Sequence, residues 1–221
     1  MGKHFSLTSS DNFKLGAYRA DPSAKAKGGI VVIQEIFGVN HHIRSIADRF
    51  AALGYVAIAP ALFDRIEVGF ECGYSPEEVQ GAMRFVANPP MQVWLLDVAA
   101  AREAIADVGK IAVVGFCLGG TLTYSAAANL PGFSAAAGYY GGHIVRMADQ
   151  VPKVPTILHF GELDAHIPMS DIEMIKSKQP SVDVYTYNAD HGFQCDERDS
   201  FAPEAAQIAW GRTVRFIDSH I

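Results

Sequence analysis

The sequence predicts an α/β fold in which a mostly parallel, doubly wound sheet follows an antiparallel hairpin. From Ile30 onward, short apolar runs alternate with amphipathic stretches, as strands and helices do when they follow one another along a chain. Several of these runs are continuously apolar, which is typical of strands covered on both faces. The 221 residues, 49% of them hydrophobic, are enough for one substantial core. We therefore expect one domain over residues 1–221.

The first elements are expected to be antiparallel. Residues 5–8 and 15–18 flank a polar run, Ser9-Ser10-Asp11-Asn12, and this pattern predicts a hairpin at the edge of the sheet. The next apolar run, 30–33, predicts the first parallel strand. A helix is expected after it, ended by Gly54, because apolar residues recur there at helical spacing: Ile43, Ile46, Ala47, Phe50 and Leu53.

The remaining apolar runs continue the series to the end of the chain. Strands are expected at 56–59, 111–114, 135–139, 156–160 and 182–187, with a helix from about Leu118 and a final helix near the C-terminus. One face of the final helix carries Ala206, Trp210, Val214 and Ile217. In sheets of this kind, ligands lie beyond the carboxyl ends of the strands. Four candidates for chemistry directly follow apolar runs: Glu35, Cys117, Asp164 and His191.

Composition and charge argue against several classes of protein. The net charge of −6 and the total of 18 Lys and Arg predict no nucleic-acid partner. We expect no membrane span and no signal peptide, because no window is apolar enough, and we therefore expect a cytoplasmic protein. The three cysteines stand singly, without a C-x-x-C motif, which suggests a reducing compartment and no disulfide framework.

Neither a cofactor nor a metal ion is expected. Asp164-x-His166 and the pair His41-His42 contain ligand types, but no third and fourth ligand follows at a spacing typical of metal sites. An exposed polar loop explains both better. The glycines around Cys117 do not have the G-x-G-x-x-G spacing of a dinucleotide site, and no P-loop is present.

The segment Gly115-Phe-Cys117-Leu-Gly119 matches the G-x-nucleophile-x-G turn that places a nucleophile between a strand and a helix, with Cys where Ser commonly stands. Glycines are needed there because side chains two residues before and after the nucleophile would collide with neighbouring elements. The free N–H groups of the helix that begins at Leu118 would favour a thiolate. Alternatively, Cys117 is a small packing residue in a tight turn.

Two later residues favour the nucleophile. In hydrolases with this turn, the triad runs along the chain as nucleophile, acid and histidine. Asp164 and His191 follow Cys117 in that order, each after a predicted strand. Taken singly, Asp164 could be a helix cap or turn acid and His191 an ordinary loop residue. The correct order of all three favours a triad.

Four motifs together resemble the dienelactone hydrolase (carboxymethylenebutenolidase) family. They are Gln34-Glu-Ile-Phe-Gly-Val39, Gly115-Phe-Cys-Leu-Gly-Gly120, Gly138-Tyr-Tyr-Gly141 and Asp190-His-Gly-Phe193, and the resemblance extends from about Gly28 to the C-terminal helix. It implies an α/β-hydrolase fold without a large lid and a cofactor-free enzyme with a Cys-His-Asp triad. The best-known member of that family opens the lactone ring of dienelactone.

The resemblance also implies roles for individual residues. Cys117 would be the nucleophile, His191 the general base and acid, and Asp164 the group that orients the imidazole. Glu35 resembles a glutamate that the family holds beside the resting thiol and that swings away when substrate binds. The oxyanion hole would be formed by the backbone N–H groups of Ile36 and Leu118.

The chain departs from the family where a substrate carboxylate would bind. The family uses two arginines, one in the helical region before the nucleophile strand and one shortly after the histidine. Arg84 lies in the first region without a clean alignment, whereas His191 is followed by Phe193, Gln194 and Cys195, and the next arginine is Arg198. The sequence therefore predicts weak binding of a substrate carboxylate. Aromatic residues that could line the pocket, or equally pack the core, are Phe37, Phe63, Trp94, Tyr139 and Tyr140.

The function that the sequence favours is hydrolysis of small lactones or esters. A broad carboxylesterase or thioesterase on the same scaffold is the first alternative. A redox sensor or small-molecule binder that uses Cys117 without turnover is the second, but it does not explain Asp164 and His191. The partner expected is a small substrate, and the expected assembly is a monomer or weak homodimer. The roles of Cys72 and Cys195 stay open.

Overall fold

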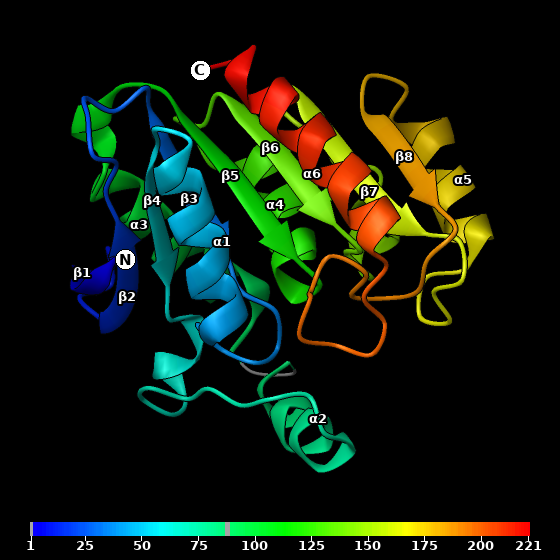
Figure 1. The fold of residues 1–221 in the computed structure, drawn as a ribbon, viewed down its shortest axis with the longest axis horizontal. Helices are drawn as coiled ribbons and strands as arrows, with labels where there is room; N and C mark the ends of the chain where they lie inside the picture. The colour runs from blue at the N-terminus through cyan, green and yellow to red at the C-terminus, as the bar shows by residue number, and fades with distance from the viewer. Residues whose placement is uncertain (1, 87–88) are drawn as a thin grey trace.

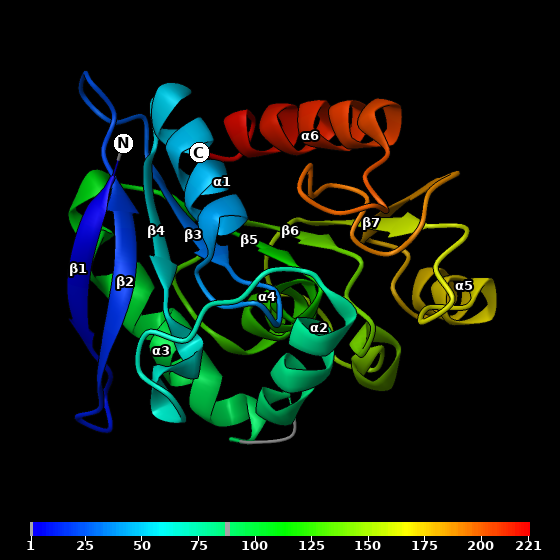
Figure 2. The same cartoon turned by 60° about the horizontal axis from the view of Figure 1, so that its bottom comes forward.

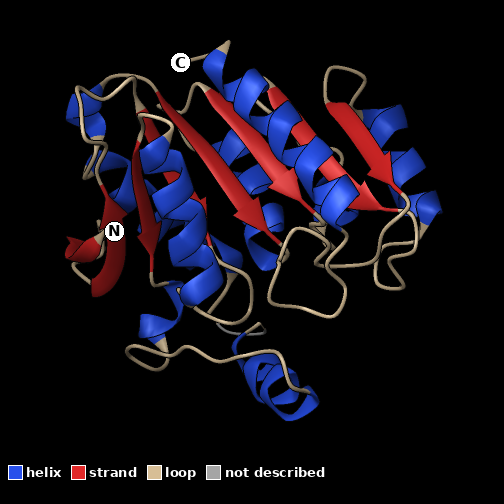
Figure 3. Cartoon of the chain, in the orientation of Figure 1, coloured by secondary structure: helices blue, strands red, loops and turns tan. Residues whose placement is uncertain are grey.

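The computed structural model describes residues 2–86 and 89–221, and it builds a single eight-stranded sheet with helices on both faces (Figure 1; Figure 3). The strand order in the sheet is β1-β2-β4-β3-β5-β6-β7-β8. In chain order the strands are β1 (Lys3–Thr8), β2 (Lys14–Ala20), β3 (Gly29–Ile33), β4 (Val56–Pro60), β5 (Ile111–Phe116), β6 (Ala135–Tyr139), β7 (Thr156–Gly161) and β8 (Asp183–Tyr187). This architecture confirms the predicted fold class.

The N-terminal hairpin forms as the sequence predicts. β1 pairs with β2 in an antiparallel register that places Leu7 opposite Leu15, and both side chains are buried. β2 in turn pairs antiparallel with β4. All the other strand pairs are parallel, from β4 and β3 through to β7 and β8.

Helices cover both faces of the sheet, which explains the continuously apolar strands. In Figure 2, α1 and α6 lie above the sheet, and α3 and α4 lie below it. β3, β4, β5, β6 and β7 are buried along their whole length, whereas only the last residue of the edge strand β8 is buried. The helices are α1 (His41–Ala52), α2 (Pro76–Ala82), α3 (Met91–Glu103), α4 (Leu118–Asn129), α5 (Met169–Lys178) and α6 (Pro203–Asp218), with short 3₁₀ turns at Leu62–Arg65, Met83–Phe85, Ala106–Val108 and Ile144–Met147.

The strand order reverses beside β3. From β3 the chain goes to β4 on one side of it, and later to β5 on the other side. In open sheets of this kind, a crevice for ligands forms at the carboxyl ends of the strands where the order reverses. β3 and β5 are parallel neighbours, so both end at the same edge of the sheet, and in Figure 1 the arrow of β5 points toward the loop that precedes α6. Glu35 and Cys117 follow these two neighbouring strands.

A buried ionic network fastens the hairpin region to α3. The carboxylate of Asp97, which is fully buried, accepts hydrogen bonds from Nε and Nη2 of Arg65 at 2.7 and 2.8 Å. The hydroxyl of Ser9 donates to the same carboxylate, and Nη1 of Arg65 reaches Asp11 at 2.9 Å. The hydrogen bonds with Asp97 and Asp11 raise the pKa of Arg65 although burial lowers it, so Arg65 stays charged.

No helix of the described residues has the length and apolar character needed to cross a bilayer.

Removing the negative charge from this network is expected to destabilise the fold. In Asp97→Asn, the Arg65 guanidinium would keep its buried position without a full counter-charge, and we expect a loss of about 3 kcal/mol in the free energy of unfolding. Urea denaturation measures this loss. The exposed pair of Glu173 with Lys176 provides the matched control, because Glu173→Gln should cost about 0.5 kcal/mol or less. Equal, small effects of the two substitutions would contradict the proposed importance of the network.

Candidate active site

Cys117 occupies a strained turn between β5 and α4. Its φ of 54° and ψ of −113° lie in a region that residues other than glycine rarely adopt. The Cys117 N–H donates to the carbonyl of Tyr139 at 3.0 Å, which fixes the turn against β6. A Cβ on Gly115 would lie 2.1 Å from the Gly119 carbonyl oxygen, and one on Gly119 would lie 2.2 Å from that of Ile33. The steric reason predicted for both glycines is therefore present in the structure.

Asp164 and His191 meet beyond the ends of β7 and β8. Nδ1 of His191 lies 2.7 Å from Oδ2 of Asp164, whose side chain is fully buried. The other oxygen of Asp164 accepts the backbone N–H of His166 at 2.8 Å. Both oxygens of the carboxylate are thus engaged, so the carboxylate holds a fixed orientation and directs the imidazole.

The charges around His191 link it to Cys117. Burial alone would lower the pKa of His191, but the negative charge of the Cys117 thiolate and the hydrogen bond to Asp164 outweigh it and raise the pKa to about 10. Burial would raise the pKa of Asp164, and the hydrogen bond and charge of His191 reverse this and lower it. The imidazole of His191 therefore holds its proton more strongly when Cys117 is ionised.

The neighbouring residues Tyr139 and Tyr140 face different surroundings. The hydroxyl of Tyr139 pairs with that of Thr213 in α6 at 2.6 Å, so this fully buried side chain packs between the sheet and α6. Tyr140 has a positive φ of 36°, and its ring centroid lies 5.0 Å from that of His191. Its buried hydroxyl has no hydrogen-bond partner among the described residues. Burial and the charge of Glu35 raise the pKa of Tyr140 well above its usual value, so the phenol stays neutral. Of the two, Tyr140 is the one beside the candidate triad.

The carboxylate of Glu35 is bound by an arginine that follows His191 in the sequence. Its side chain is 1% exposed, and Oε1 accepts a hydrogen bond from Nη1 of Arg198 at 3.2 Å. The guanidinium of Arg198 lies over the ring of Phe37 at 5.5 Å. Oε2 of Glu35 has no hydrogen-bond partner among the described residues. Phe37, predicted as a pocket aromatic, therefore contacts the charged part of the site.

Arg198, the next arginine after His191 in the sequence, lies at the site beside Glu35. Two successive turns, with the N–H of Cys195 bonded to the Gly192 carbonyl and that of Arg198 to the Cys195 carbonyl, fold the chain back after His191. Gly192 has a φ of 80°, and a Cβ there would lie 2.2 Å from Nη1 of Arg198. The guanidinium of Arg198 thus reaches the site although Arg198 lies three residues after Cys195. The sequence spacing alone does not predict this position.

Other predicted site residues lie as follows. Leu118 is the first residue of α4, and the hydrogen bonds of the described residues leave its N–H and that of Ile36 free to donate. Arg84 is mostly exposed, pairs with Glu67 at 2.5 Å and lies over the ring of Phe85. Phe63 is buried and stacks on the same Phe85 ring, with Trp94 beside it. Arg84 and Phe63 thus both contact Phe85, and Trp94 contacts Phe63.

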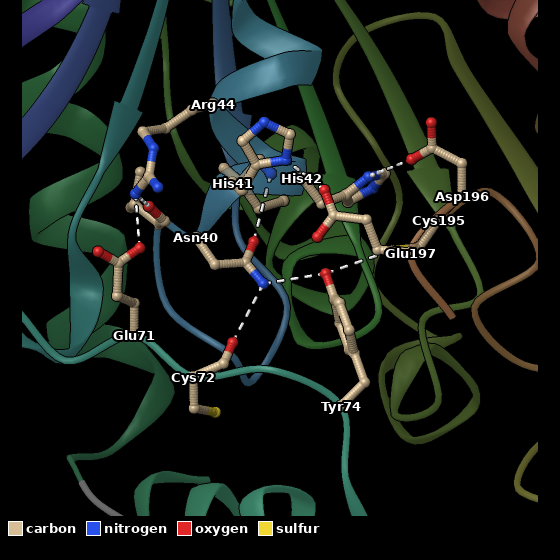
Figure 4. Close-up of polar contacts among 12 residues, drawn as sticks. Asn40, His41, His42, Arg44, Glu71, Cys72, Tyr74, Cys195, Asp196 and Glu197 are labelled. Carbon is tan, nitrogen blue, oxygen red and sulfur yellow. Dashed lines mark hydrogen bonds and ion pairs between the residues drawn. The ribbon is translucent and has the colours of Figure 1, made fainter. Parts of the chain in front are cut away.

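Sequence reasoning missed a group of polar residues around Glu35. His42 in α1 and Cys195 in the loop before α6 are buried, and their ligand atoms and the Glu35 carboxylate lie within 4.8 Å of one another. Tyr74 contacts Cys195, and Asn40 contacts Tyr74 (Figure 4). The only sequence signal was the pair His41-His42, because the members come from four separate segments.

The pKa of His191 should fall when the sulfur anion is removed. Cys117→Ala deletes the largest influence that raises this pKa, so the imidazolium should lose its proton at a pH below about 10. NMR titration of histidine ring signals between pH 6 and 11 measures the change. His143, whose pKa is lowered by burial, is the internal control and should not respond. An unchanged His191 titration would mean that no thiolate acts on the imidazole.

The chain is similar to known proteins along nearly its whole length. Residues 15–221 match the model of the dienelactone hydrolase family. The chain is 35% identical to a "Putative carboxymethylenebutenolidase" of Synechocystis sp., an alignment that covers 95% of this chain and 94% of the relative, and 29% identical to one of Escherichia coli K12 that covers 98% and 86%.

Solved structures extend the comparison. The crystal structure of a putative dienelactone hydrolase from Klebsiella pneumoniae is similar, with a TM-score of 0.83 at 30% identity, and the alignment covers 96% of this chain and 98% of that one. The Pyrococcus furiosus esterase Pf2001, at 13% identity and a TM-score of 0.72, covers 100% and 91% and shares the fold. With the family model matched over nearly the whole chain, this protein belongs to the dienelactone hydrolase family of α/β-hydrolase enzymes.

Proposed function

We propose that this protein hydrolyses small lactones or carboxylic esters through a thioester intermediate on Cys117. The observation that carries the proposal is the 2.7 Å contact between Nδ1 of His191 and Oδ2 of Asp164. The pKa of the same imidazole is raised by the charge of Cys117. A strained turn holds Cys117 at the N-terminal end of α4, where backbone N–H groups that have no partner within the helix can stabilise negative charge. The three residues have the chemistry and order of a nucleophilic triad.

The proposed reaction begins with attack of the Cys117 thiolate on the acyl carbon. The N–H groups of Leu118 and Ile36 donate hydrogen bonds to the carbonyl oxygen and stabilise the negative charge that develops on it. His191 donates its proton from Nε2 to the departing alkoxide, leaving a thioester and a neutral imidazole. His191 then removes a proton from water, which attacks the thioester and releases the acid and the thiolate. Asp164 holds the ring in the required tautomer throughout.

Arg198 and Glu35 support recognition of an anionic substrate. The carboxylate of Glu35 already occupies the guanidinium, so a substrate carboxylate of the same geometry could take its place. Displacement of Glu35 by substrate is also what the family resemblance implies, although Arg198 partly compensates its charge here. We therefore propose Arg198, rather than Arg84, as the group that contacts a substrate carboxylate.

A broad carboxylesterase or thioesterase is the alternative, since the triad would act on neutral esters without Arg198. A non-catalytic thiol sensor leaves the Asp164–His191 pair unexplained. The three cysteines are all free, and with the acidic net charge they favour a cytoplasmic enzyme that acts on small molecules. We also propose that residues 1–221 act as one domain and that the enzyme is a monomer or weak homodimer.

Substitutions in the triad should be strongly non-additive. Cys117→Ala and His191→Ala should each lower kcat/KM for p-nitrophenyl acetate and for a dienelactone by about 10⁴-fold or more, and the double variant should be little worse. Asp164→Ala should be milder. Mass spectrometry of rapidly quenched wild-type enzyme should find the acyl group on the peptide that contains Cys117, and Cys72→Ser should leave the rate unchanged. Substantial turnover by Cys117→Ala would refute this mechanism.

Arg198 should distinguish anionic from neutral substrates. Charge-assisted hydrogen bonds contribute about 1.5–3 kcal/mol, so Arg198→Gln should raise KM for an anionic lactone about 10- to 100-fold more than KM for a neutral ester. Arg84→Gln is the matched comparison, and the exposed position of Arg84 predicts little selective change. Selective loss of anionic substrate in Arg84→Gln but not in Arg198→Gln would assign the contact to Arg84 instead.

A further inference from the structure

Three buried metal-ligand side chains converge beside the candidate active site. Glu35 follows β3, His42 lies in the first turn of α1, and Cys195 lies in the loop before α6. Each is at most 1% exposed, and one ligand atom from each lies within 4.8 Å of those of the other two. The proposed reaction uses neither His42 nor Cys195, so hydrolysis does not account for this group, which we call the Glu35–His42–Cys195 cluster.

Two polar atoms in the cluster lack partners. Oε2 of Glu35 and Nε2 of His42 are buried and have no hydrogen-bond partner among the described residues. A buried polar atom without a partner costs about 1–3 kcal/mol, so two of them in one cluster call for an explanation. Nδ1 of His42 lies 3.6 Å from Oδ1 of Asp196, which favours a proton on Nδ1 and a free lone pair on Nε2. Glu35 and His42 then each offer an unpartnered lone pair in a cluster whose ligand atoms lie within 4.8 Å of one another.

We propose that the Glu35–His42–Cys195 cluster binds a divalent zinc ion. Carboxylate oxygen, imidazole nitrogen and thiolate sulfur are the three ligand types that zinc takes in proteins, whereas magnesium and calcium take oxygen. Three protein ligands leave a fourth position for water. The two anionic ligands, together with the carboxylate of Asp196, outweigh the positive charge of Arg198.

The partners of Glu35 and His42 suit such a site. Oε1 of Glu35 accepts from Arg198 at 3.2 Å, which orients the carboxylate and leaves Oε2 for the metal. Asp196 stands behind the imidazole of His42, as carboxylates do behind zinc-bound histidines. The side chain of Asp196 is 67% exposed, so it also presents a negative charge to cations arriving from solvent. Figure 4 shows Asp196 beside His42.

The partner of Cys195 suits it as well. Sγ of Cys195 lies 3.2 Å from the hydroxyl of Tyr74, whose oxygen accepts from Nδ2 of Asn40 at 2.9 Å (Figure 4). Once the thiol loses its proton to solvent and its sulfur bonds to zinc, the hydroxyl of Tyr74 can turn and donate to the sulfur. A cysteine binds zinc as the thiolate, so the thiol of Cys195 must lose its proton when the metal binds. Zinc binding would therefore release one proton from Cys195 near neutral pH.

The observed spacing requires only small movements. Bonds of about 2.0–2.3 Å to a tetrahedral zinc place ligand atoms about 3.3–3.8 Å apart. The ligand atoms of the cluster lie within 4.8 Å of one another, so rotations that shift side-chain tips by about 1 Å would close the site. The competing interpretation is a direct hydrogen bond between Glu35 and His42 with no ion.

The test measures metal binding rather than hydrolysis, so its outcome is independent of the proposed function. Chelator-treated enzyme is titrated with Zn²⁺ against a chromophoric chelator, and with Co²⁺ to record the thiolate-to-cobalt charge-transfer absorption. We expect one equivalent per chain. Affinity should rise about tenfold per pH unit near neutrality, because one thiol proton is displaced. Cys195→Ser should abolish the charge-transfer band, and both it and His42→Gln should weaken Zn²⁺ binding at least tenfold.

The controls are matched by residue type. Cys72→Ser and His41→Gln remove the neighbouring free thiol and the adjacent exposed histidine, and both should bind Zn²⁺ and Co²⁺ as wild type does. Cys117→Ser should also keep the band. If the band disappears in Cys117→Ser and survives in Cys195→Ser, the metal binds at the proposed triad and the cluster is not the site.

A second measurement covers variants that fail to fold. In wild-type enzyme, Zn²⁺ should slow alkylation of Cys195 at least tenfold, as measured by peptide mapping, while Cys72 keeps its rate. No binding of Zn²⁺ at micromolar concentrations, or binding without protection of Cys195, would overturn the proposal in favour of a metal-free hydrogen bond.

Discussion

The backbone turn at Cys117 is the constraint on which the arrangement of the site depends. A side chain held at a positive φ costs about 1–3 kcal/mol and persists only where the surroundings leave the chain no alternative. Here β5 is buried along its whole length, α4 packs directly behind the turn, and the Cys117 N–H is fixed to β6. The position of the Cys117 sulfur is therefore fixed by the centre of the sheet rather than by a loop. The other side chains of the site extend toward this fixed position.

Two ion pairs surround this point from different sides. Asp164 and His191 form one beyond β7 and β8, and Glu35 and Arg198 form the other beyond β3. In each pair a buried carboxylate contacts a basic group, His191 or Arg198, that interacts electrostatically with Cys117. The two carboxylates differ in how they are satisfied. Asp164 uses both oxygens, whereas Glu35 keeps one oxygen unpartnered among the described residues, which leaves it free to change partner.

Local patterns in the sequence predicted the sheet, the hairpin and the positions after the strand ends, because strand periodicity and turn glycines act over a few residues. The contact of Asp164 with His191 followed from the fact that both come after neighbouring parallel strands. The position of Arg198 could not be predicted, since it depends on two turns that shorten the path from His191. Tyr139 and Tyr140 were both possible pocket residues, because the sequence does not say which of the two faces the site; only Tyr140 lies beside His191. The helices α2 and α3 were also missed. The apolar residues of α3 lie on several sides, where it contacts the sheet, α4 and β1, so they show no single stripe.

The strands that hold Cys117 and His191 differ in how firmly they are packed. Cys117 belongs to β5, in the middle of the sheet, whereas His191 follows β8, a half-exposed strand with one neighbour. Edges of this kind open locally at a lower free energy than the global transition, and their amide hydrogens exchange sooner. Fraying of β8 would carry the imidazole away while the thiol stayed in its turn. Warming would therefore separate His191 from Cys117 before global unfolding, and the protein would stay folded with a cysteine that lacks its histidine partner.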